Sequence, residues 1–235
     1  MKSGFGQFCP VAVACEVFAE RWTPIILREL LVGSHRFNEI RRGIPLISRA
    51  LLAQRLRDLE TAGVVVSTPA AAGHGREYRL TDAGMEFRGV IEGLGVWGQR
   101  WTVRVNPRNL DAGLLMWNIR RRIQVEQLPA QHVVVRFDYR GVPSGHRNPR
   151  TYWLELDRPE VDLCVSDPGF EVDLYVDADL AAMAKVWLGD VSLASVLRSK
   201  EVRITGPRTL VGAFQSWLPL SAYAAVPRPR AGSAR

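Results

Sequence analysis

The chain has 235 residues, 47% of them hydrophobic and 23% charged, a composition typical of a folded protein with room for two domains. No apolar run approaches the roughly 20 residues that a membrane-spanning helix needs, and the amino terminus lacks the apolar stretch of a secretory signal. We therefore expect a cytoplasmic protein with no membrane partner. The net charge of +7 favours a polyanionic partner.

The residue types that carry chemistry are sparse and scattered. Cys9, Cys15 and Cys164 have no CxxC spacing and no companion histidine cluster, which argues against a disulfide scaffold and a metal site. The sequence holds no nucleophile motif and no phosphate-binding glycine loop. We therefore expect no catalytic residue, no cofactor and no enzyme activity.

The first predicted elements are three helices. Apolar positions recur over residues 10–31 around Pro24, which is tolerated in the first turn of a new helical piece. A short helix opens at residues 37–40 and stops near Gly43. Ser48 is a good N-cap for the next helix, which ends at Gly63 and carries a helically spaced leucine stripe: Leu52, Leu56 and Leu59.

A hairpin and a further helix follow. Residues 64–68 and 77–80 read as paired strands around a small-residue loop, and Thr81 and Asp82 can cap a helix that runs to about residue 103. Helix, short helix, helix, two strands and helix is the order of a winged helix-turn-helix. That order places the helix over residues 48–62 in the major groove of DNA.

The exposed face of that helix suits base edges. On a helical wheel the leucine stripe faces the core, and Ala50, Ala53, Gln54 and Arg57 lie opposite. Glutamine can pair with adenine, and arginine with guanine, through two hydrogen bonds each. Residues 36–57 hold six arginines against the single acid Glu39. This local excess is the electrostatic footprint of a DNA-binding surface.

Further side chains are candidates for the phosphate backbone. They are Arg36, Arg41, Arg42, Ser48 and Arg49, with His74 and Arg76 from the hairpin loop. Each arginine has the solvated surface as its alternative. For Arg55, which falls nearer the core side of the wheel, an internal ion pair is at least as plausible as a phosphate contact.

Beyond residue 107 the pattern changes. Residues 110–128 read as a helix, whose basic run at residues 120–122 we expect on a solvated or interdomain face. Alternation of period two then predicts an antiparallel sheet from residues 133–137, 152–156, 161–165 and 170–176. Two helices at residues 178–188 and 191–199, a strand at 202–205 and a helix at 207–217 follow.

Motifs in the first half carry a family resemblance. They are CP at residues 9–10, ERWT at 20–23, ILREL at 26–30, RFNEI at 36–40, IP at 44–45, IS at 47–48, LAQRLRDLE at 52–60, Gly63, YRLTDAG at 78–84 and Trp97. In this order they resemble the HxlR family of winged helix-turn-helix regulators. The resemblance implies a homodimer, joined by the first and last helices of the module, on an inverted-repeat operator.

The same resemblance bears on one cysteine. Cys9 matches a position that serves as a redox or electrophile sensor in some members of the family. A buried structural thiol is the alternative, which we favour because no adjacent basic residue is present to lower the pKa of the thiol.

The second half is similar to the sterol-carrier-protein-2 (SCP2) fold. The similarity rests on VDLYV at residues 172–176, WLGD at 187–190 and SKEVRITG at 199–206. That fold is a sheet covered by helices around an apolar tunnel, which implies a hydrophobic small-molecule effector. Candidate lining residues are Leu163, Val165, Trp187, Val196 and Leu197. Their alternative is a role in the core.

Together these patterns predict an α+β chain. Residues 1–104 are expected to form the winged helix-turn-helix and dimerisation domain, 105–130 a connecting helix that transmits signals, 131–226 an SCP2-like ligand-sensing domain and 227–235 a disordered tail. The expected function is transcription regulation through double-stranded DNA, modulated by a hydrophobic small molecule. The competing hypothesis is a lipid-binding or carrier protein whose winged module only dimerises. The basic helix face argues against it, because dimerisation requires no arginines there.

Overall fold

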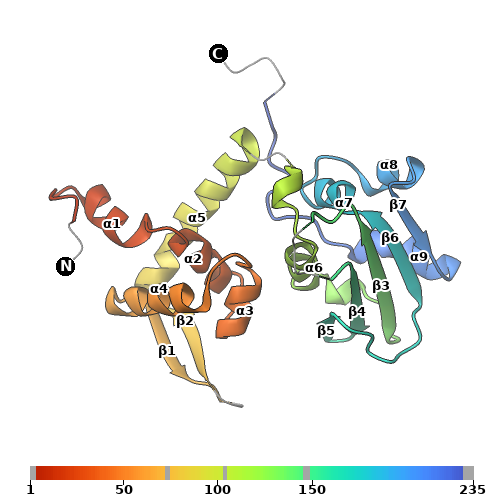
Figure 1. The fold of residues 1–235 in the computed structure, drawn as a ribbon, viewed down its shortest axis with the longest axis horizontal. Coiled ribbons are helices and arrows are strands. Elements are labelled where there is room, and N and C mark those ends of the chain that lie inside the picture. The colour runs from red at the N-terminus through yellow and green to blue at the C-terminus, as the bar shows by residue number, and fades with distance from the viewer. Residues whose placement is uncertain (1–3, 72–74, 103–104, 145–148, 230–235) are drawn as a thin grey trace. The chain divides into compact units, whose positions relative to one another are not determined.

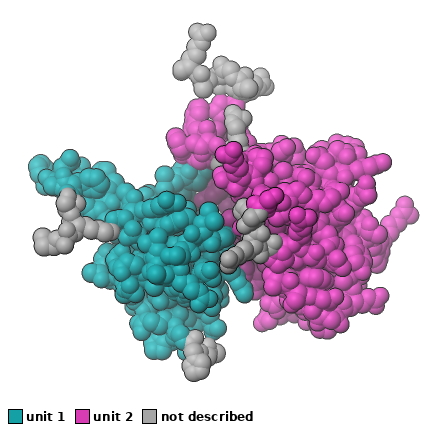
Figure 2. Space-filling view, viewed as in Figure 1, with its two compact units in different colours: residues 1–96 teal, residues 97–235 magenta. Residues whose placement is uncertain are grey.

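The computed structural model describes residues 4–71, 75–102, 105–144 and 149–229, and its elements are labelled in Figure 1. The chain divides into two compact units, residues 1–96 and residues 97–235, which Figure 2 colours separately. Helix α5, Asp82–Trp101, carries residues of both units. Within the described ranges, no helix is long and apolar enough to cross a membrane.

The first unit has the predicted order of helices and strands. Its elements are α1 (Pro10–Phe18), α2 (Thr23–Leu31), α3 (Phe37–Arg42), α4 (Arg49–Thr61), β1 (Val65–Pro69), β2 (Arg76–Leu80) and the greater part of α5. Strands β1 and β2 pair antiparallel, with Val65 opposite Leu80. The break expected near Pro24 is present, because α1 ends at Phe18 and α2 begins at Thr23.

Helix α4 forms where its sequence signals place it. The Ser48 hydroxyl accepts a hydrogen bond from the backbone N–H of Leu51 at 3.2 Å, which confirms the predicted N-cap. At the other end Gly63, with φ 71°, supplies the left-handed residue that stops the helix. The leucine stripe is fully buried, as predicted, against Ile26, Leu27 and Ile40 from α2 and α3. Burial of one face therefore fixes which face of α4 remains outside.

A buried charged cluster positions the turn between α3 and α4. The Glu29 carboxylate, with no solvent exposure, accepts hydrogen bonds from Arg28 at 2.6 Å and from the Ser34 hydroxyl at 3.2 Å. Arg28 also donates to the Gly43 carbonyl at 2.9 Å. A Cβ atom on Gly43 would overlap the Glu29 carboxylate. Any larger residue at this position would have to displace the buried carboxylate, and the cluster ties α2 to the turn that leads into α4.

The second unit is an α+β sheet structure. Its strands are β3 (Val133–Arg140), β4 (Thr151–Asp157), β5 (Glu160–Cys164), β6 (Leu174–Asp179) and β7 (Val202–Thr205), in the order β5-β4-β3-β6-β7. The expectation of a wholly antiparallel sheet is wrong at the centre, where β3 and β6 run parallel. The reason is the segment 165–173, which returns the chain to the starting end of β3 before β6 begins. Alternation of period two reports one buried face and carries no information on strand direction.

Helices close this sheet around a separate core. They are α6 (Ala112–Arg120), α7 (Leu180–Trp187), α8 (Leu193–Arg198) and α9 (Arg208–Trp217), with short 3-10 turns η1 (Pro107–Asn109) and η2 (Val125–Gln127). Met116 and Ile119 of α6 are buried with Phe137 of β3 and with Phe214 and Trp217 of α9. This cluster shares no residue with the core of the first unit.

The connecting helix predicted over residues 110–128 is wrong in length and place. Helix α6 ends at Arg120 and is packed into the core of the second unit. The basic run that follows is used inside this unit: Arg120 Nε donates to the Val161 carbonyl at 2.8 Å, and Arg122 Nε to the Leu220 carbonyl at 3.1 Å. Arg120 and Arg121 are half-buried and Arg122 is exposed. The expected solvated face is therefore present at Arg122, whereas Arg120 packs inside the unit.

The start of the predicted disordered tail is also held in place. Arg228 pairs with Asp190 at 2.8 Å and donates from Nε to the Gln99 carbonyl at 3.1 Å. Residues 230–235 of the predicted tail lie outside the described residues. At Arg228, therefore, the expectation of disorder is wrong.

Candidate functional site

The outer face of α4 carries the residues expected there. Ala50, Gln54 and Arg57 are exposed and Ala53 is half-buried, opposite the buried leucine stripe. Arg49 is exposed in the first turn beside Ser48. Backbone N–H groups and a guanidinium at a helix amino terminus favour a phosphate. The face therefore combines base-reading side chains along the helix with an anion-attracting end.

Gln54 and Arg57 are held in a short chain of hydrogen bonds. Gln54 Nε2 donates to Asp58 Oδ1 at 2.8 Å, and Arg57 Nη2 donates to Gln54 Oε1 at 2.7 Å. These bonds fix the rotamers of both side chains toward the same surface. Because they are exposed, they can be exchanged for hydrogen bonds to a base at small cost. Asp58 is the member that the sequence analysis missed, although its i+4 spacing from Gln54 is a visible signal.

Arg55 belongs to the interior of the unit and not to the outer face. Its side chain is 12% exposed and forms ion pairs with Glu20 at 2.7 Å and Asp58 at 3.0 Å. Its Nε also donates to the Arg21 carbonyl at 3.3 Å. Of the two roles left open from the sequence, the structure shows the internal ion pair, which joins α4 to the segment between α1 and α2.

Three of the predicted phosphate-binding arginines lie at the ends of α3: Arg36 at its start, and Arg41 and Arg42 at its end. Arg36 precedes it, with Nε 3.8 Å from Glu77 Oε1 of β2, and its backbone N–H donates to Glu39 at 3.0 Å. Arg41 is half-buried and Arg42 is exposed. Arg36 is therefore already paired with a carboxylate of the hairpin.

Of the two hairpin residues predicted to contact DNA, Arg76 is described by the structure. Arg76 donates from Nε to the Ser67 hydroxyl at 2.7 Å and from Nη2 to the Ser67 carbonyl at 3.0 Å. The Ser67 hydroxyl in turn donates to Glu60 of α4. Arg76 thus lies across the hairpin, with its exposed guanidinium beside α4. His74 lies outside the described residues.

Cys9 is exposed at the amino terminus of α1, so the favoured interpretation of a buried structural thiol is wrong. Hydrogen bonds from the backbone N–H groups of Ala12 and Val11 hold the pKa of the Cys9 thiol below its ordinary value of 9.0. A basic neighbour is not required for this effect, because a helix amino terminus supplies positive potential without a basic side chain. In contrast, burial and a hydrogen bond to Glu155 raise the pKa of Cys164 to about 11.

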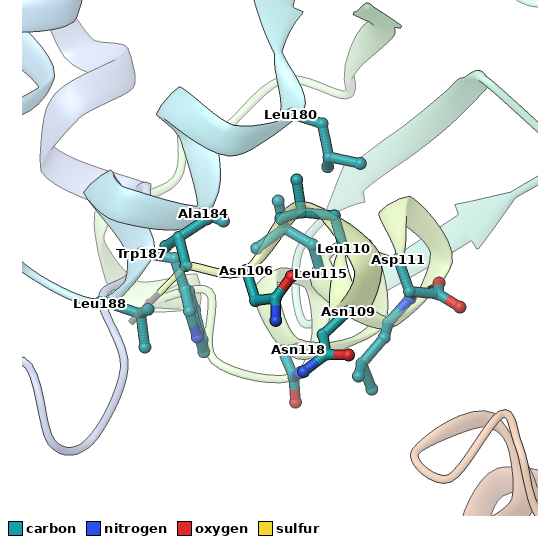
Figure 3. Close-up of a pocket in the computed structure, with 12 residues that line it drawn as sticks. Asn106, Asn109, Leu110, Asp111, Leu115, Asn118, Leu180, Ala184, Trp187 and Leu188 are labelled. Carbon is teal, nitrogen blue, oxygen red and sulfur yellow. Dashed lines mark hydrogen bonds between the residues drawn. The ribbon is translucent and has the colours of Figure 1, made fainter. Parts of the chain in front are cut away.

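The predicted ligand residues do not gather around one pocket. Leu163, half-buried, and Val165, exposed, lie on or just after β5 at one edge of the sheet. Val196, buried, and Leu197, exposed, lie on α8, which packs against β7 at the opposite edge. Trp187 alone of the five lines the pocket of about 260 Å³ drawn in Figure 3. Within the described residues, no group of three or more His, Cys, Asp or Glu side chains could hold a metal ion.

Comparisons with known proteins concern the first unit and the start of the second. A family model described as HxlR-like helix-turn-helix matches residues 17–106. The HTH-type transcriptional regulator YvaP of Bacillus subtilis is 33% identical over 111 residues, which make up 45% of this chain and 96% of that relative. The HTH-type transcriptional regulator Rv3095 of Mycobacterium tuberculosis is 39% identical over 95 residues, 40% of this chain and 60% of that relative.

A solved structure aligns over a similar share of the chain. It is the reduced form of the transcriptional regulator YodB from B. subtilis, at 28% identity and a TM-score of 0.36, over 43% of this chain and all of that chain. The match to YvaP over nearly its whole length, together with the family model, establishes the relationship. The chain belongs to the HxlR-like helix-turn-helix family of transcriptional regulators.

Proposed function

We propose that this regulator binds an inverted-repeat operator as a homodimer and that its second unit receives a hydrophobic small molecule. The observation that carries the DNA-binding part is α4, which buries its leucine stripe and leaves Gln54 and Arg57 exposed. In a helix-turn-helix protein, such a helix enters the major groove with its exposed face and packs against the hydrophobic core of its domain with the other face.

The proposed contacts are supported by residue type and, for the described residues, by their exposure. Gln54 and Arg57 read bases, because their amide and guanidinium groups share one exposed face and exposed hydrogen bonds. Ser48 and Arg49 hold a phosphate at the start of α4, and Arg41 and Arg42 neutralise further phosphates from the end of α3. Arg76, together with His74, contacts the neighbouring backbone or minor groove from the hairpin.

Unpartnered apolar side chains support the homodimer. All nine residues of α1 are described and none is buried, with Val11 and Val13 70% and 51% exposed. Helix α5 likewise exposes Leu94, Trp97 and Trp101 at 48%, 58% and 53%. Exposed apolar side chains that recur along two helices favour a protein contact over a solvated face. Two copies related by a twofold axis would then meet a DNA site of the same symmetry.

The ligand-sensing part rests on the second unit. A sheet covered by helices around its own core supports the proposed SCP2-like fold. Helix α5 takes over the transmitting role that the sequence analysis gave to residues 105–130, since α5 carries residues of both units. A ligand changes operator affinity only if it binds two states of the dimer unequally.

Selection from a random double-stranded DNA library tests the DNA-binding part. We expect a twofold-symmetric site, which a gel shift then compares with a scrambled sequence of equal composition. Preference for the symmetric site supports the proposal, and the salt dependence of binding counts the phosphate contacts. Equal affinity for both sequences would instead favour a module that serves only for dimerisation.

A further inference from the structure

The pocket of about 260 Å³ in the second unit has an apolar wall and a polar side. The wall comes from Leu110 and Leu115 around α6 and from Leu180, Ala184 and Trp187 of α7. These residues face the same space in Figure 3. Clefts for drug-sized ligands measure about 300–1,000 Å³, so the pocket fits a molecule with a single ring.

Three carboxamides form the polar side. Asn106 precedes η1, Asn109 is the last residue of η1, and Asn118 is on α6. All three line the pocket and lie close together in Figure 3. Asn106 Oδ1 accepts from the Arg108 backbone N–H at 3.0 Å, and Asn118 Oδ1 accepts from Arg121. Each of these side chains also carries an NH₂ group, which can donate a hydrogen bond to a ligand oxygen. Two amide donors beside an apolar wall suit a ligand oxygen that accepts hydrogen bonds.

The charge of the pocket selects among such ligands. Among the described residues that line the pocket, Asp111 is the one that carries a charge, and one of its carboxylate oxygens caps α6 through the Leu114 backbone N–H at 2.8 Å. This negative charge repels a carboxylate or phosphate. Because this carboxylate already caps α6 and takes part in a further interaction within the chain, a ligand cation would have to compete for it.

We propose that this pocket binds a small uncharged aromatic compound whose carbonyl oxygen accepts hydrogen bonds from Asn106 and Asn118. The ring packs on Trp187 and Ala184. The proposal rests on the ligand-sensing role proposed above and names the chemistry of its ligand. The site differs from the lining set expected from the sequence, with which it shares only Trp187.

The pocket is joined to α5 by a hydrogen bond inside the second unit. Gln99 of α5 is buried, and its Nε2 donates to the carbonyl of Leu188, a pocket residue, at 3.0 Å. Arg228 in turn donates to the Gln99 carbonyl. A molecule seated against Leu188 would therefore alter the surroundings of the last turn of α5. This gives ligand binding a direct route to a helix of the regulator.

Ligand-observed NMR titration of the full chain tests the proposal with three probes of the same ring. They are benzamide, which is uncharged and carries a carbonyl, benzoate, which is negative, and benzylamine, which is positive. We expect benzamide to bind with a Kd at least tenfold lower than that of either charged probe. If benzoate or benzylamine binds as tightly as benzamide, the proposed ligand chemistry is wrong.

Two variants place the binding in this pocket. Ala184→Leu fills the wall and Asn118→Leu removes an amide donor, and each should raise the Kd of benzamide at least tenfold. Ala194→Leu, at an exposed position of α8, and Asn38→Leu, at an exposed position of α3, are the matched controls. Unchanged affinity in both pocket variants, with thermal unfolding like that of the parent chain, would overturn the proposal. The titration contains no DNA, so failure of operator binding is a separate result.

Discussion

Two arginines of α4, two positions apart, should respond to the same substitution in opposite ways. Arg57 is exposed and bonded to Gln54, whereas Arg55 is 12% exposed and paired with Glu20 and Asp58. Arg57→Ala removes the proposed base contact, which is worth about 1–3 kcal/mol, and should weaken operator binding by roughly 5- to 150-fold. It removes only an exposed hydrogen bond from the fold, so stability should change by less than about 0.5 kcal/mol.

Arg55→Ala should instead destabilise the first unit. Breaking a fully buried ion pair costs about 3–5 kcal/mol, and exposed pairs cost about 0–1 kcal/mol. Its partners Glu20 and Asp58 are 34% and 42% exposed, so we expect an intermediate loss of about 1–2 kcal/mol. For a unit of this size that loss lowers Tm by roughly 4–16 °C.

Calorimetric unfolding and a gel shift on the selected operator measure the two effects on the same samples. Gln54→Ala serves as a second outer-face variant and should behave like Arg57→Ala. The reasoning is refuted if Arg57→Ala unfolds the unit, or if Arg55→Ala leaves Tm unchanged and abolishes operator binding. Either result would mean that the two faces of α4 have been exchanged.

Four further predictions follow from single contacts. Gly43→Ala should lower the free energy of unfolding of the first unit by about 3 kcal/mol or more, because the new Cβ displaces the buried Glu29 carboxylate. Urea unfolding measures this change, and a decrease of less than about 1 kcal/mol would contradict the prediction. At pH 8, iodoacetamide should modify Cys9 faster than Cys164, because the pKa of Cys9 is lowered and that of Cys164 is raised, so a larger fraction of Cys9 is thiolate. Mass spectrometry of the digested protein measures the rate of modification at each cysteine, and faster modification of Cys164 would contradict the prediction. Leu94→Glu on α5 should shift the chain from dimer to monomer in analytical ultracentrifugation, and an unchanged dimer argues against that face. Gln99→Leu should keep benzamide binding within twofold while reducing the ligand's effect on operator affinity; an undiminished effect excludes this hydrogen bond as the route.

Local signals were enough to predict helix α4. Ser48, the leucine stripe and Gly63 act within a few residues of one another, so cap, buried face and end can be read without the fold. Most strands of the second unit were likewise predicted, and the strand at residues 202–205 has the predicted bounds. The strand predicted at residues 170–176 is displaced, because β6 runs from Leu174 to Asp179 into the start of the predicted helix. Both cases depend on periodicity, which burial imposes along the chain itself.

Only the tertiary structure decided the features that join distant residues. Arg55 meets Glu20, 35 positions earlier, and Gln99 meets Leu188, 89 positions later, and no spacing rule predicts such pairs. The parallel pairing of β3 with β6 depends on the path of the loop at residues 165–173. The pocket likewise combines residues after α5, on α6 and on α7. A sequence pattern records which face is buried, and the packing of elements determines what that face meets.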